Sequence, residues 1–274
     1  MIPRRGGATT ALGDVDQASV EALVSGAPLL RGSTVILTGA TGGIGRHLAR
    51  VLAAAGAKVG LADLSSEALQ TLAGDLSGAG FSVLCEAFDA SSSDDFLAFH
   101  QRVELELGTV DGLVNCAGRW EPKRFQDVTT ADLTSMVTAN VTTAFVACQS
   151  VLPGMIARRQ GSIVNFASTA GEYGSITPAA HYAAAKGAVI GMTKSLAREA
   201  SPDNVRVNAI SPGPTDTVAL GAATPEQKAD VGSRTLFNRL GQPDEIAAGC
   251  VYLLSPLSSF VTGHVLRVNG GSLL

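Results

Sequence analysis

Thr38-Gly-Ala-Thr-Gly-Gly-Ile-Gly45 follows directly on the apolar run Val35-Ile36-Leu37. This order predicts a buried strand that breaks into a glycine turn and restarts as a helix. Gly39 permits the tight turn, while Gly43 and Gly45 remove Cβ atoms where a ligand and a facing strand must approach the new helix. Because the first N–H groups of a helix have no intrahelical acceptor, the turn predicts a binding site for a pyrophosphate group.

Apolar strand-like runs and helical patterns alternate from Thr34 onward, which is the rhythm of successive βαβ units with right-handed crossovers. The predicted strands span 34–38, 58–62, 82–87, 112–115, 161–166, 206–210 and 265–268. The predicted helices span 43–55, 65–78, 92–107, 131–159, 180–200 and 243–254. We therefore predict an α/β fold in which a doubly wound, Rossmann-type parallel sheet of seven strands is flanked by helices on both faces.

The composition fits one such domain, since 274 residues with 46% hydrophobic content can bury a large core. We assign residues 34–274 to a single Rossmann-fold domain and residues 1–33 to a partly flexible extension that has one short helix at 16–25. The formal charge is −4 and there is no dense basic stripe, which argues against nucleic acid as a partner.

Cysteine usage and the N-terminus predict a cytoplasmic protein. The four cysteines show no CxxC spacing and are interpreted as small buried hydrophobes in a reducing compartment: Cys85, Cys116, Cys148 and Cys250. Met1-Ile-Pro-Arg-Arg5 is not followed by the apolar core of a secretory signal. No stretch approaches the roughly 18 consecutive apolar residues that span a bilayer, so we expect no membrane partner.

Asp63 lies at the end of the second predicted strand, where an acidic side chain can accept hydrogen bonds from an adenosine ribose. This position favours NAD over NADP, because a 2′-phosphate would meet the carboxylate and the adjacent residues 64–66 supply no cation. Arg46 remains a cation that could reach a phosphate. The alternative interpretation of Asp63 is a helix N-cap or a solvated turn residue.

Tyr182-Ala-Ala-Ala-Lys186 places a phenol and an ammonium group one helical turn apart on one face. A tyrosine with its ordinary pKa of about 10 is protonated at neutral pH. We expect the charge of Lys186 to lower that pKa, as a general base working near neutral pH requires. Taken alone, the same spacing is also typical of a solvent-exposed helix face.

Several motifs occur together and in order, namely Thr38-Gly-x-x-x-Gly-x-Gly45, Asn115-Cys-Ala-Gly118, Asn140, Ser168, Tyr182-x-x-x-Lys186 and Pro212-Gly213. Through this combination the chain resembles the short-chain dehydrogenase/reductase family. The resemblance extends from about Thr34 to Gly271 and implies a nicotinamide-dependent oxidoreductase that acts on CH–OH donors. The family more often has a second Asn where this chain has Cys116, and we expect that side chain to point into the core.

The resemblance also implies roles for individual residues. Tyr182 would be the general acid/base, Ser168 would hydrogen-bond the substrate oxygen, Lys186 would also hold the nicotinamide ribose, and Asn140 would order a relay water. The implied cofactor site comprises Gly39, Thr41, Gly42, Gly43, Ile44, Gly45, Asp63, Leu64, Asp89, Ala90, Asn115, Ala117, Gly118, Tyr182, Lys186, Pro212, Gly213, Thr215 and Thr217. It further implies a homotetramer that packs through the long helices around 131–159 and 180–200.

The segment 211–241 interrupts the alternation with Pro212, Pro214 and Pro225, at the edge of the sheet where ligands bind. We interpret it as a lid over the substrate, the alternative being a surface loop. Candidate pocket walls are Trp120, Thr169, Glu172, Tyr173, Ser175, Leu220, Leu236 and Phe237, while His181 is expected to line the pocket or pack. The four histidines are scattered and predict no metal site, and no G-x-S-x-G elbow supports a hydrolase.

Three functions remain open from the sequence. The leading hypothesis is hydride transfer between NAD(H) and a small or medium secondary alcohol or ketone, by a mechanism using Ser168, Tyr182, Lys186 and Asn140. The second is an NADPH-dependent 3-oxoacyl-thioester reductase. The third, from another class, is a non-catalytic nucleotide-sensing or scaffold protein, against which the intact Ser168, Tyr182 and Lys186 argue.

Overall fold

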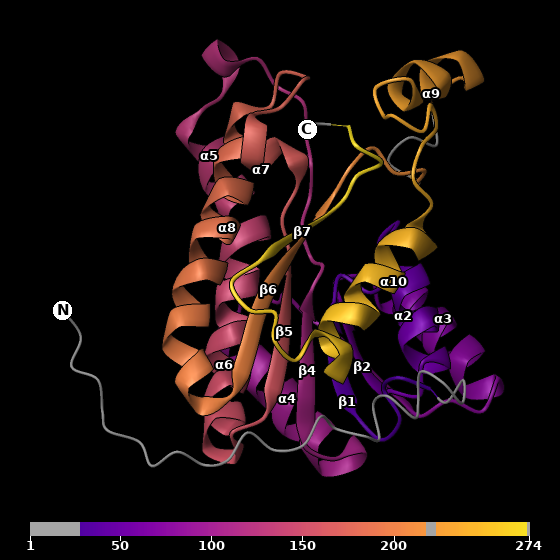
Figure 1. Ribbon diagram of the computed structural model, residues 1–274, viewed down its shortest axis with the longest axis vertical. Helices are drawn as coiled ribbons and strands as arrows, with labels where there is room; N and C mark the ends of the chain where they lie inside the picture. The colour runs from indigo at the N-terminus through magenta and orange to yellow at the C-terminus, as the bar shows by residue number, and fades with distance from the viewer. Residues whose placement is uncertain (1–27, 218–222, 273–274) are drawn as a thin grey trace.

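Seven parallel strands form the centre of the protein in the order β3-β2-β1-β4-β5-β6-β7, as the computed structural model shows (Figure 1). The structure describes residues 28–217 and 223–272. The strands are β1 (Thr34–Thr38), β2 (Lys58–Asp63), β3 (Val83–Ala87), β4 (Val110–Asn115), β5 (Gly161–Phe166), β6 (Val205–Pro212) and β7 (Val265–Val268). The predicted doubly wound parallel sheet is confirmed.

Helices cover both faces of the sheet (Figure 1). On one face α2 (Gly45–Ala54), α3 (Ser66–Gly78) and α10 (Pro243–Leu254) bury Leu48, Leu69 and Ile246 in a common apolar core. On the other face lie α4 (Ser93–Leu107), α6 (Thr143–Arg158) and α8 (Ala180–Ala200), whose core includes Phe96 and Met155. All five residues of β1 are buried, as expected of a central strand with helices above and below it.

The strand order of the sheet reverses between β1 and β4, and in sheets of this kind ligands bind in the crevice at such a point. β1 pairs with β2 on one side and with β4 on the other, so the strand order reverses at this point. Thr38 and Asn115 are partners in register at the carboxyl edge. The segments that leave β1 and β4 must therefore diverge to opposite faces, and the space between them opens at this edge.

The predicted helix over 131–159 is not continuous. It consists of α5 (Thr130–Val137), a π-helical turn (Thr138–Thr142) and then α6. At the π turn the side chain of Asn140 donates a 3.0 Å hydrogen bond to the carbonyl oxygen of Met136, four residues earlier. The Asn amide thus takes an acceptor that a regular α-helix gives to a backbone N–H, and the widened turn accommodates it.

Two short helices were not predicted as separate elements. α7 (Thr169–Tyr173) follows β5 directly, and the hydroxyl of Ser168 caps it by accepting a 3.1 Å hydrogen bond from the N–H of Ala170. α9 (Pro225–Gly232) lies within the proline-containing excursion and is capped by Thr224. Both elements stand beyond the carboxyl edge of the sheet (Figure 1).

The stretch Thr130–Arg158 has the length and mean hydropathy of a membrane-crossing helix, 29 residues with a value of 1.2. Within its apolar window, 44% of the residues are buried in the fold, where α6 packs on β4 and α4. Core helices of folded proteins meet the same criterion, so the expected lack of a membrane partner stays a prediction.

The beginning of the described chain packs beneath the sheet. Leu30 is buried, and its N–H donates a 2.8 Å hydrogen bond to the carbonyl oxygen of Ala55 at the end of α2. The helix predicted at 16–25 lies outside the described residues. The division into an extension over 1–33 and one domain over 34–274 therefore stays a prediction.

Candidate active site

A cavity of about 680 Å³ opens at the carboxyl edge of β1, β4, β5 and β6. Its volume is typical of a pocket for a cofactor or another small molecule. All the predicted catalytic residues, Asn140, Ser168, Tyr182 and Lys186, line this cavity. So do the predicted cofactor residues Gly39, Thr41, Gly42, Gly43, Ile44, Gly45, Asp63, Leu64, Asp89, Ala90, Ala117, Gly118, Pro212, Gly213, Thr215 and Thr217.

The glycine turn leaves room and hydrogen-bond donors for an anion. Gly39 has φ +68°, and a Cβ there would lie 2.7 Å from the Cα of Ala117. A Cβ on Gly43 would lie 2.6 Å from the Cβ of Thr217 across the cavity. Among the described residues, the N–H groups of Gly43 and Ile44 have no hydrogen-bond acceptor. Because these donors stand at the start of α2, the turn fits the pyrophosphate of a dinucleotide.

Asp63 lies beside this turn at the end of β2. One oxygen of its carboxylate accepts a 2.8 Å hydrogen bond from the N–H of Thr41, and the other accepts a 2.7 Å bond from the N–H of Leu64. Oδ1 also accepts a longer, 3.5 Å hydrogen bond from the N–H of Ser65, whereas Oδ2 accepts only from Thr41 among the described residues and can still accept a hydrogen bond from a ribose hydroxyl. None of the described Lys and Arg side chains forms an ion pair with Asp63.

Tyr182 lies in the first turn of α8, with Ser168 close to its hydroxyl. Burial raises the pKa of Tyr182, and a hydrogen bond with Ser168 offsets part of this effect. The predicted lowering of this pKa by Lys186 is therefore wrong, because desolvation outweighs the contact with Ser168. Since the oxygen of Ser168 accepts from Ala170 at the helix cap, its O–H is left to donate toward the cavity.

Lys186 is buried between the sheet and α8. Its Nζ donates a 2.8 Å hydrogen bond to the carbonyl oxygen of Phe166 and lies 5.9 Å from the centroid of the Tyr182 ring. Burial lowers the pKa of Lys186 to about 8. The ammonium group is thus held next to the phenol at neutral pH, but it loses its proton at a pH far below that of an exposed lysine.

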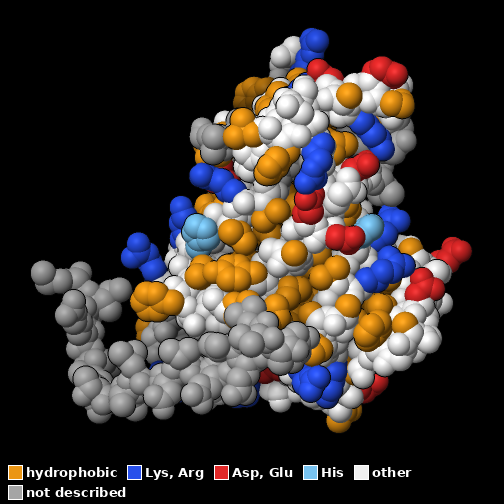
Figure 2. Space-filling model, turned by 45° about the vertical axis from the view of Figure 1, so that its right-hand side comes forward, with side chains coloured by type: hydrophobic (Ala, Val, Ile, Leu, Met, Phe, Trp, Pro, Cys, Tyr) orange, Lys and Arg blue, Asp and Glu red, His pale blue; other side chains and the backbone are white. Residues whose placement is uncertain are grey.

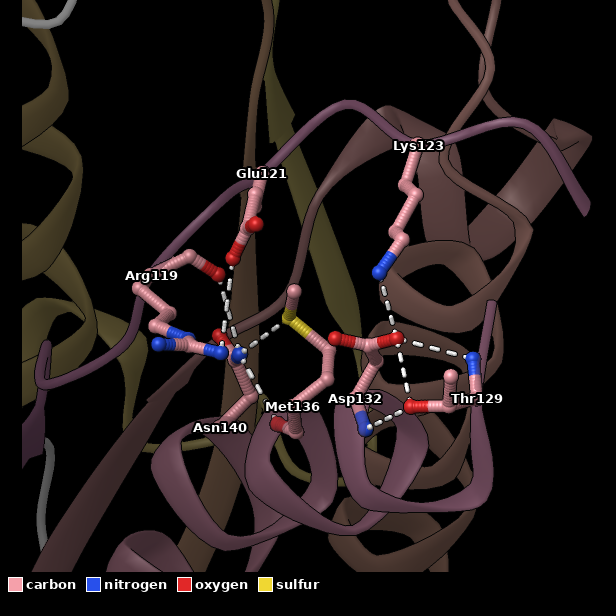
Figure 3. A network of polar contacts seen from close by, with 7 residues as sticks. All are labelled: Arg119, Glu121, Lys123, Thr129, Asp132, Met136 and Asn140. Atoms are coloured by element: carbon pink, nitrogen blue, oxygen red, sulfur yellow. Dashed lines mark hydrogen bonds and ion pairs between the residues drawn. The ribbon is translucent and has the colours of Figure 1, made fainter. Parts of the chain in front are cut away.

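Asn140 is positioned by the π turn. Its Nδ2 donates 3.0 Å hydrogen bonds to the carbonyl oxygens of Arg119 and Met136 (Figure 3). Its Oδ1 is buried and has no partner among the described residues. A Cβ on Gly118 would lie 2.5 Å from that oxygen and 3.4 Å from the Nζ of Lys186. An acceptor without a partner therefore stands close to the buried lysine.

Asn115 is the one predicted cofactor residue that does not line the cavity, and this assignment is corrected. Its side chain is buried below the cavity floor, where Nδ2 donates a 2.8 Å hydrogen bond to Oδ1 of Asn165 on β5. Asn115 and Asn165 are partners in register on neighbouring strands, so their side chains lie on the same face of the sheet and bond to each other there. Cys116 packs against the core as expected but also forms part of the cavity wall.

Most of the residues that were predicted to form the wall of the substrate pocket do not line the cavity. Of its described members only Trp120 lines the cavity, and Leu220 lies outside the described residues. Five further residues line the cavity and were not predicted: Arg119 from the loop after β4, and Ser135, Thr138, Ala139 and Thr143 from the α5 to α6 region. The spacing of the last four around Asn140 is that of one helical face, which is the signal that would have found them. No pattern in the sequence indicates Arg119.

The excursion after β6 is anchored at its two ends. The N–H of Asp216 donates to the carbonyl oxygen of Gly241 at 2.9 Å, and the N–H of Gly241 donates to that of Pro214 at 2.9 Å. Thr215 and Thr217, on the first of these ends, line the cavity. The interpretation of the segment as a lid stays a prediction.

Comparisons with known proteins agree with this geometry. The family model described as Enoyl-(Acyl carrier protein) reductase matches residues 39–272. A 3-oxoacyl-[acyl-carrier-protein] reductase of Vibrio cholerae is 36% identical over 242 residues, which cover 88% of this chain and 98% of the relative. The 2-(S)-hydroxypropyl-CoM dehydrogenase 3 of Xanthobacter autotrophicus is 35% identical over 248 residues, covering 88% and 97%.

Among solved structures, a 3-oxoacyl-[acyl-carrier protein] reductase with bound NAD from Brucella melitensis is 36% identical, with a TM-score of 0.81 and coverage of 89% of this chain and 93% of that chain. The chain belongs to the short-chain dehydrogenase/reductase family, and it is an NAD(P)-dependent oxidoreductase. Family membership therefore removes the hypothesis of a non-catalytic scaffold.

Proposed function

We propose that the protein transfers a hydride between NAD(H) and a small or medium secondary alcohol or ketone. The observation that carries this proposal is the grouping of Tyr182, Ser168 and Lys186 in the same cavity as the free N–H groups of the glycine turn. The three side chains suit proton transfer at a carbonyl or alcohol oxygen. The N–H groups of the glycine turn suit the phosphates of a dinucleotide. A bound nicotinamide supplies the hydride acceptor or donor, and the protein supplies position and proton transfer.

In the oxidative direction, Tyr182 accepts the proton of the alcohol and Ser168 donates a hydrogen bond to the same oxygen. In reduction, Tyr182 returns that proton as negative charge builds on the oxygen. The contact with Ser168 favours the phenolate form of Tyr182 and offsets part of the effect of burial, while Lys186, whose Nζ lies 5.9 Å from the centroid of the Tyr182 ring, can hold the nicotinamide ribose. The free Oδ1 of Asn140 can hold a water molecule beside Lys186, through which the proton passes to solvent.

NAD is the proposed cofactor because Asp63 faces the adenosine side of the cavity. Replacing this carboxylate by Ser removes both a ribose acceptor and the charge that repels a 2′-phosphate. For Asp63→Ser we expect kcat/KM with NAD to fall about tenfold or more, as for loss of a hydrogen bond to a charged group. The ratio of kcat/KM with NAD to that with NADP is expected to shift toward NADP.

Asp75→Ser is the matched control, since Asp75 is an exposed carboxylate on neighbouring α3 that pairs with Arg50 at 3.3 Å. This variant is expected to keep the wild-type cofactor ratio in initial-rate measurements. A wild-type enzyme that strongly prefers NADPH would overturn the assignment of NAD.

A second candidate is an NADPH-dependent 3-oxoacyl-thioester reductase. The similarity to the Vibrio and Brucella 3-oxoacyl-[acyl-carrier-protein] reductases supports the thioester substrate of this candidate, but not its NADPH dependence, because the Brucella reductase has NAD bound. Initial rates with an acetoacetyl thioester and either reduced cofactor distinguish the two. High activity with the thioester and NADPH, together with no oxidation of simple secondary alcohols, would select this candidate.

We further propose a cytoplasmic homotetramer. Phe145 on α6 and Leu133 and Val137 on α5 expose apolar surface, which supports packing between subunits through these helices. Light scattering at several protein concentrations tests this proposal, and a monomer at all concentrations would contradict it.

A further inference from the structure

Lys123 connects three segments near the part of the cavity that Gly118, Arg119 and Trp120 line, which is the proposed substrate end. Its Nζ lies 2.6 Å from Oδ2 of Asp132 in the first turn of α5 (Figure 3). Its backbone N–H donates a 2.7 Å hydrogen bond to the carbonyl oxygen of Pro178, two residues before α8 begins. One residue in the loop after β4 thus holds the starts of two helices.

Asp132 is itself firmly held. The same oxygen, Oδ2, accepts a 2.8 Å hydrogen bond from the N–H of Thr129 and a 2.7 Å bond from its hydroxyl, so that Asp132 and Thr129 form the capping box of α5 (Figure 3). The hydrogen bond from Lys123 and those from Thr129 hold the pKa of Asp132 well below its usual range. The carboxylate of Asp132 therefore stays ionised at neutral pH.

The held loop carries part of the cavity wall. Gly118, Arg119 and Trp120 line the cavity just before Lys123. At the other end of the loop, the carbonyl oxygen of Arg119 accepts from the side chain of Asn140 (Figure 3). The segment 119–123 is thus fixed to the helix of Asn140 at one end and to the beginning of the helix of Tyr182 at the other.

We propose that Lys123 and Asp132 are positioning residues that set the shape of the substrate end of the cavity. They hold the wall formed by Trp120 against the first turns of α5 and α8, so that the alcohol binds against a wall that is already in place. This proposal rests on the proposed function for its kinetic consequence, but the position of the loop can be measured without turnover.

Kinetics provide the first test. For Lys123→Met and for Asp132→Asn, which keeps a capping oxygen, we expect KM for the alcohol to rise about tenfold, because a loosened wall must be ordered each time the alcohol binds. The kcat value is expected to stay within about twofold, and Lys123→Arg is expected to restore KM. Because the pKa of Asp132 lies well below its usual range, removing this carboxylate is expected to leave the inflections of the pH–rate profile in place.

Asp203→Asn is the matched control. Asp203 also forms an ion pair, with Arg159 at 3.0 Å, but at the opposite edge of the sheet, where β5 and β6 begin. Removing that carboxylate is expected to leave KM unchanged. Equal KM values in all these variants and in the wild type would overturn the proposal, as would a loss of thermal stability unaccompanied by a change in KM.

Trp120 provides a second test that needs no substrate, because it is the only tryptophan in the chain and lies three residues from Lys123. In Lys123→Met we expect its emission to shift to longer wavelength and its quenching by acrylamide to increase, with no change in Asp203→Asn. Unchanged emission in both Lys123→Met and Asp132→Asn would overturn the proposal. If the wild type oxidised no alcohol, the proposed function would fail while this measurement still decided the role of Lys123.

Discussion

Tyr182→Phe is expected to lower kcat for alcohol oxidation by about a thousandfold, as for removal of a general acid/base. The substitution removes one hydroxyl and leaves the ring in place against Lys186. Cofactor affinity and thermal stability are therefore expected to stay close to those of the wild type. Steady-state kinetics, a titration of Trp120 fluorescence with NADH and thermal unfolding together check the three expectations.

Tyr252→Phe is the control for this result. Tyr252 lies on α10, outside the residues that line the cavity, and is partly exposed. Its hydroxyl should be irrelevant to turnover. If Tyr182→Phe kept wild-type kcat, proton transfer by this phenol would have to be abandoned, whatever the effect of the control.

Lys186→Met is expected to abolish most of the activity and yet to stabilise the fold near pH 7. The lysine is buried, and the decrease in its pKa from 10.5 to about 8 corresponds to about 3 kcal/mol of unfavourable free energy for the charged form. Methionine fills similar space without a charge, although the carbonyl oxygen of Phe166 then loses its donor. Chemical denaturation should show a net gain of about 1 kcal/mol or more, after the cost of an unpaired acceptor.

The pH dependence of this gain follows from the direction of the shift. Between about pH 8 and 10.5 the unfolded wild-type chain binds a proton at Lys186 that the folded chain has lost, so wild-type stability rises with pH in this window. The advantage of Lys186→Met is therefore largest below pH 8 and disappears toward pH 10.5. Lys194→Met, on an exposed position of the same helix, is expected to show neither the gain nor the loss of activity.

Much of the fold could be predicted because its signals are local. The apolar runs of the strands and the glycine turn after β1 each determine their own conformation, and the alternation of strands and helices limits the topology to a few choices. Likewise, Tyr182 and Lys186 are four residues apart, so they lie on the same face of any α-helix that contains them. These features place the predicted catalytic residues at one edge of the sheet without knowledge of distant contacts.

The remaining features depend on contacts between segments distant in sequence. The π turn at Asn140 depends on a side chain that bonds both to Met136 and to the loop at Arg119, and no periodicity encodes that loop. Asn115 was placed in the cofactor site by its neighbours in sequence, whereas its partner Asn165 lies on another strand. Burial raises the pKa of Tyr182 and the contact with Ser168 lowers it. The balance of these two effects depends on how the chain packs, which the sequence pattern does not give.

The substrate wall was predicted least well for the same reason. Residues 169, 172, 173 and 175 follow Ser168 in sequence but do not line the cavity, whereas Arg119 and Trp120 of the loop after β4 do. The position of this loop is fixed by the contacts of Lys123 with Asp132 and Pro178. The sequence pattern around a lysine in an irregular loop does not indicate which helices the lysine will contact.

Direct transfer of a labelled hydride tests the central claim most sharply. The protein would be incubated with NAD and with secondary alcohols that carry deuterium on the carbinol carbon, including 2-butanol, 1-phenylethanol and a 3-hydroxybutyryl thioester. The account predicts that at least one alcohol delivers its deuterium to C4 of the nicotinamide ring, detected by mass spectrometry of the reduced cofactor, and that Tyr182→Phe suppresses the transfer. Reduced cofactor without deuterium, or equal labelling by wild type and Tyr182→Phe, would contradict it.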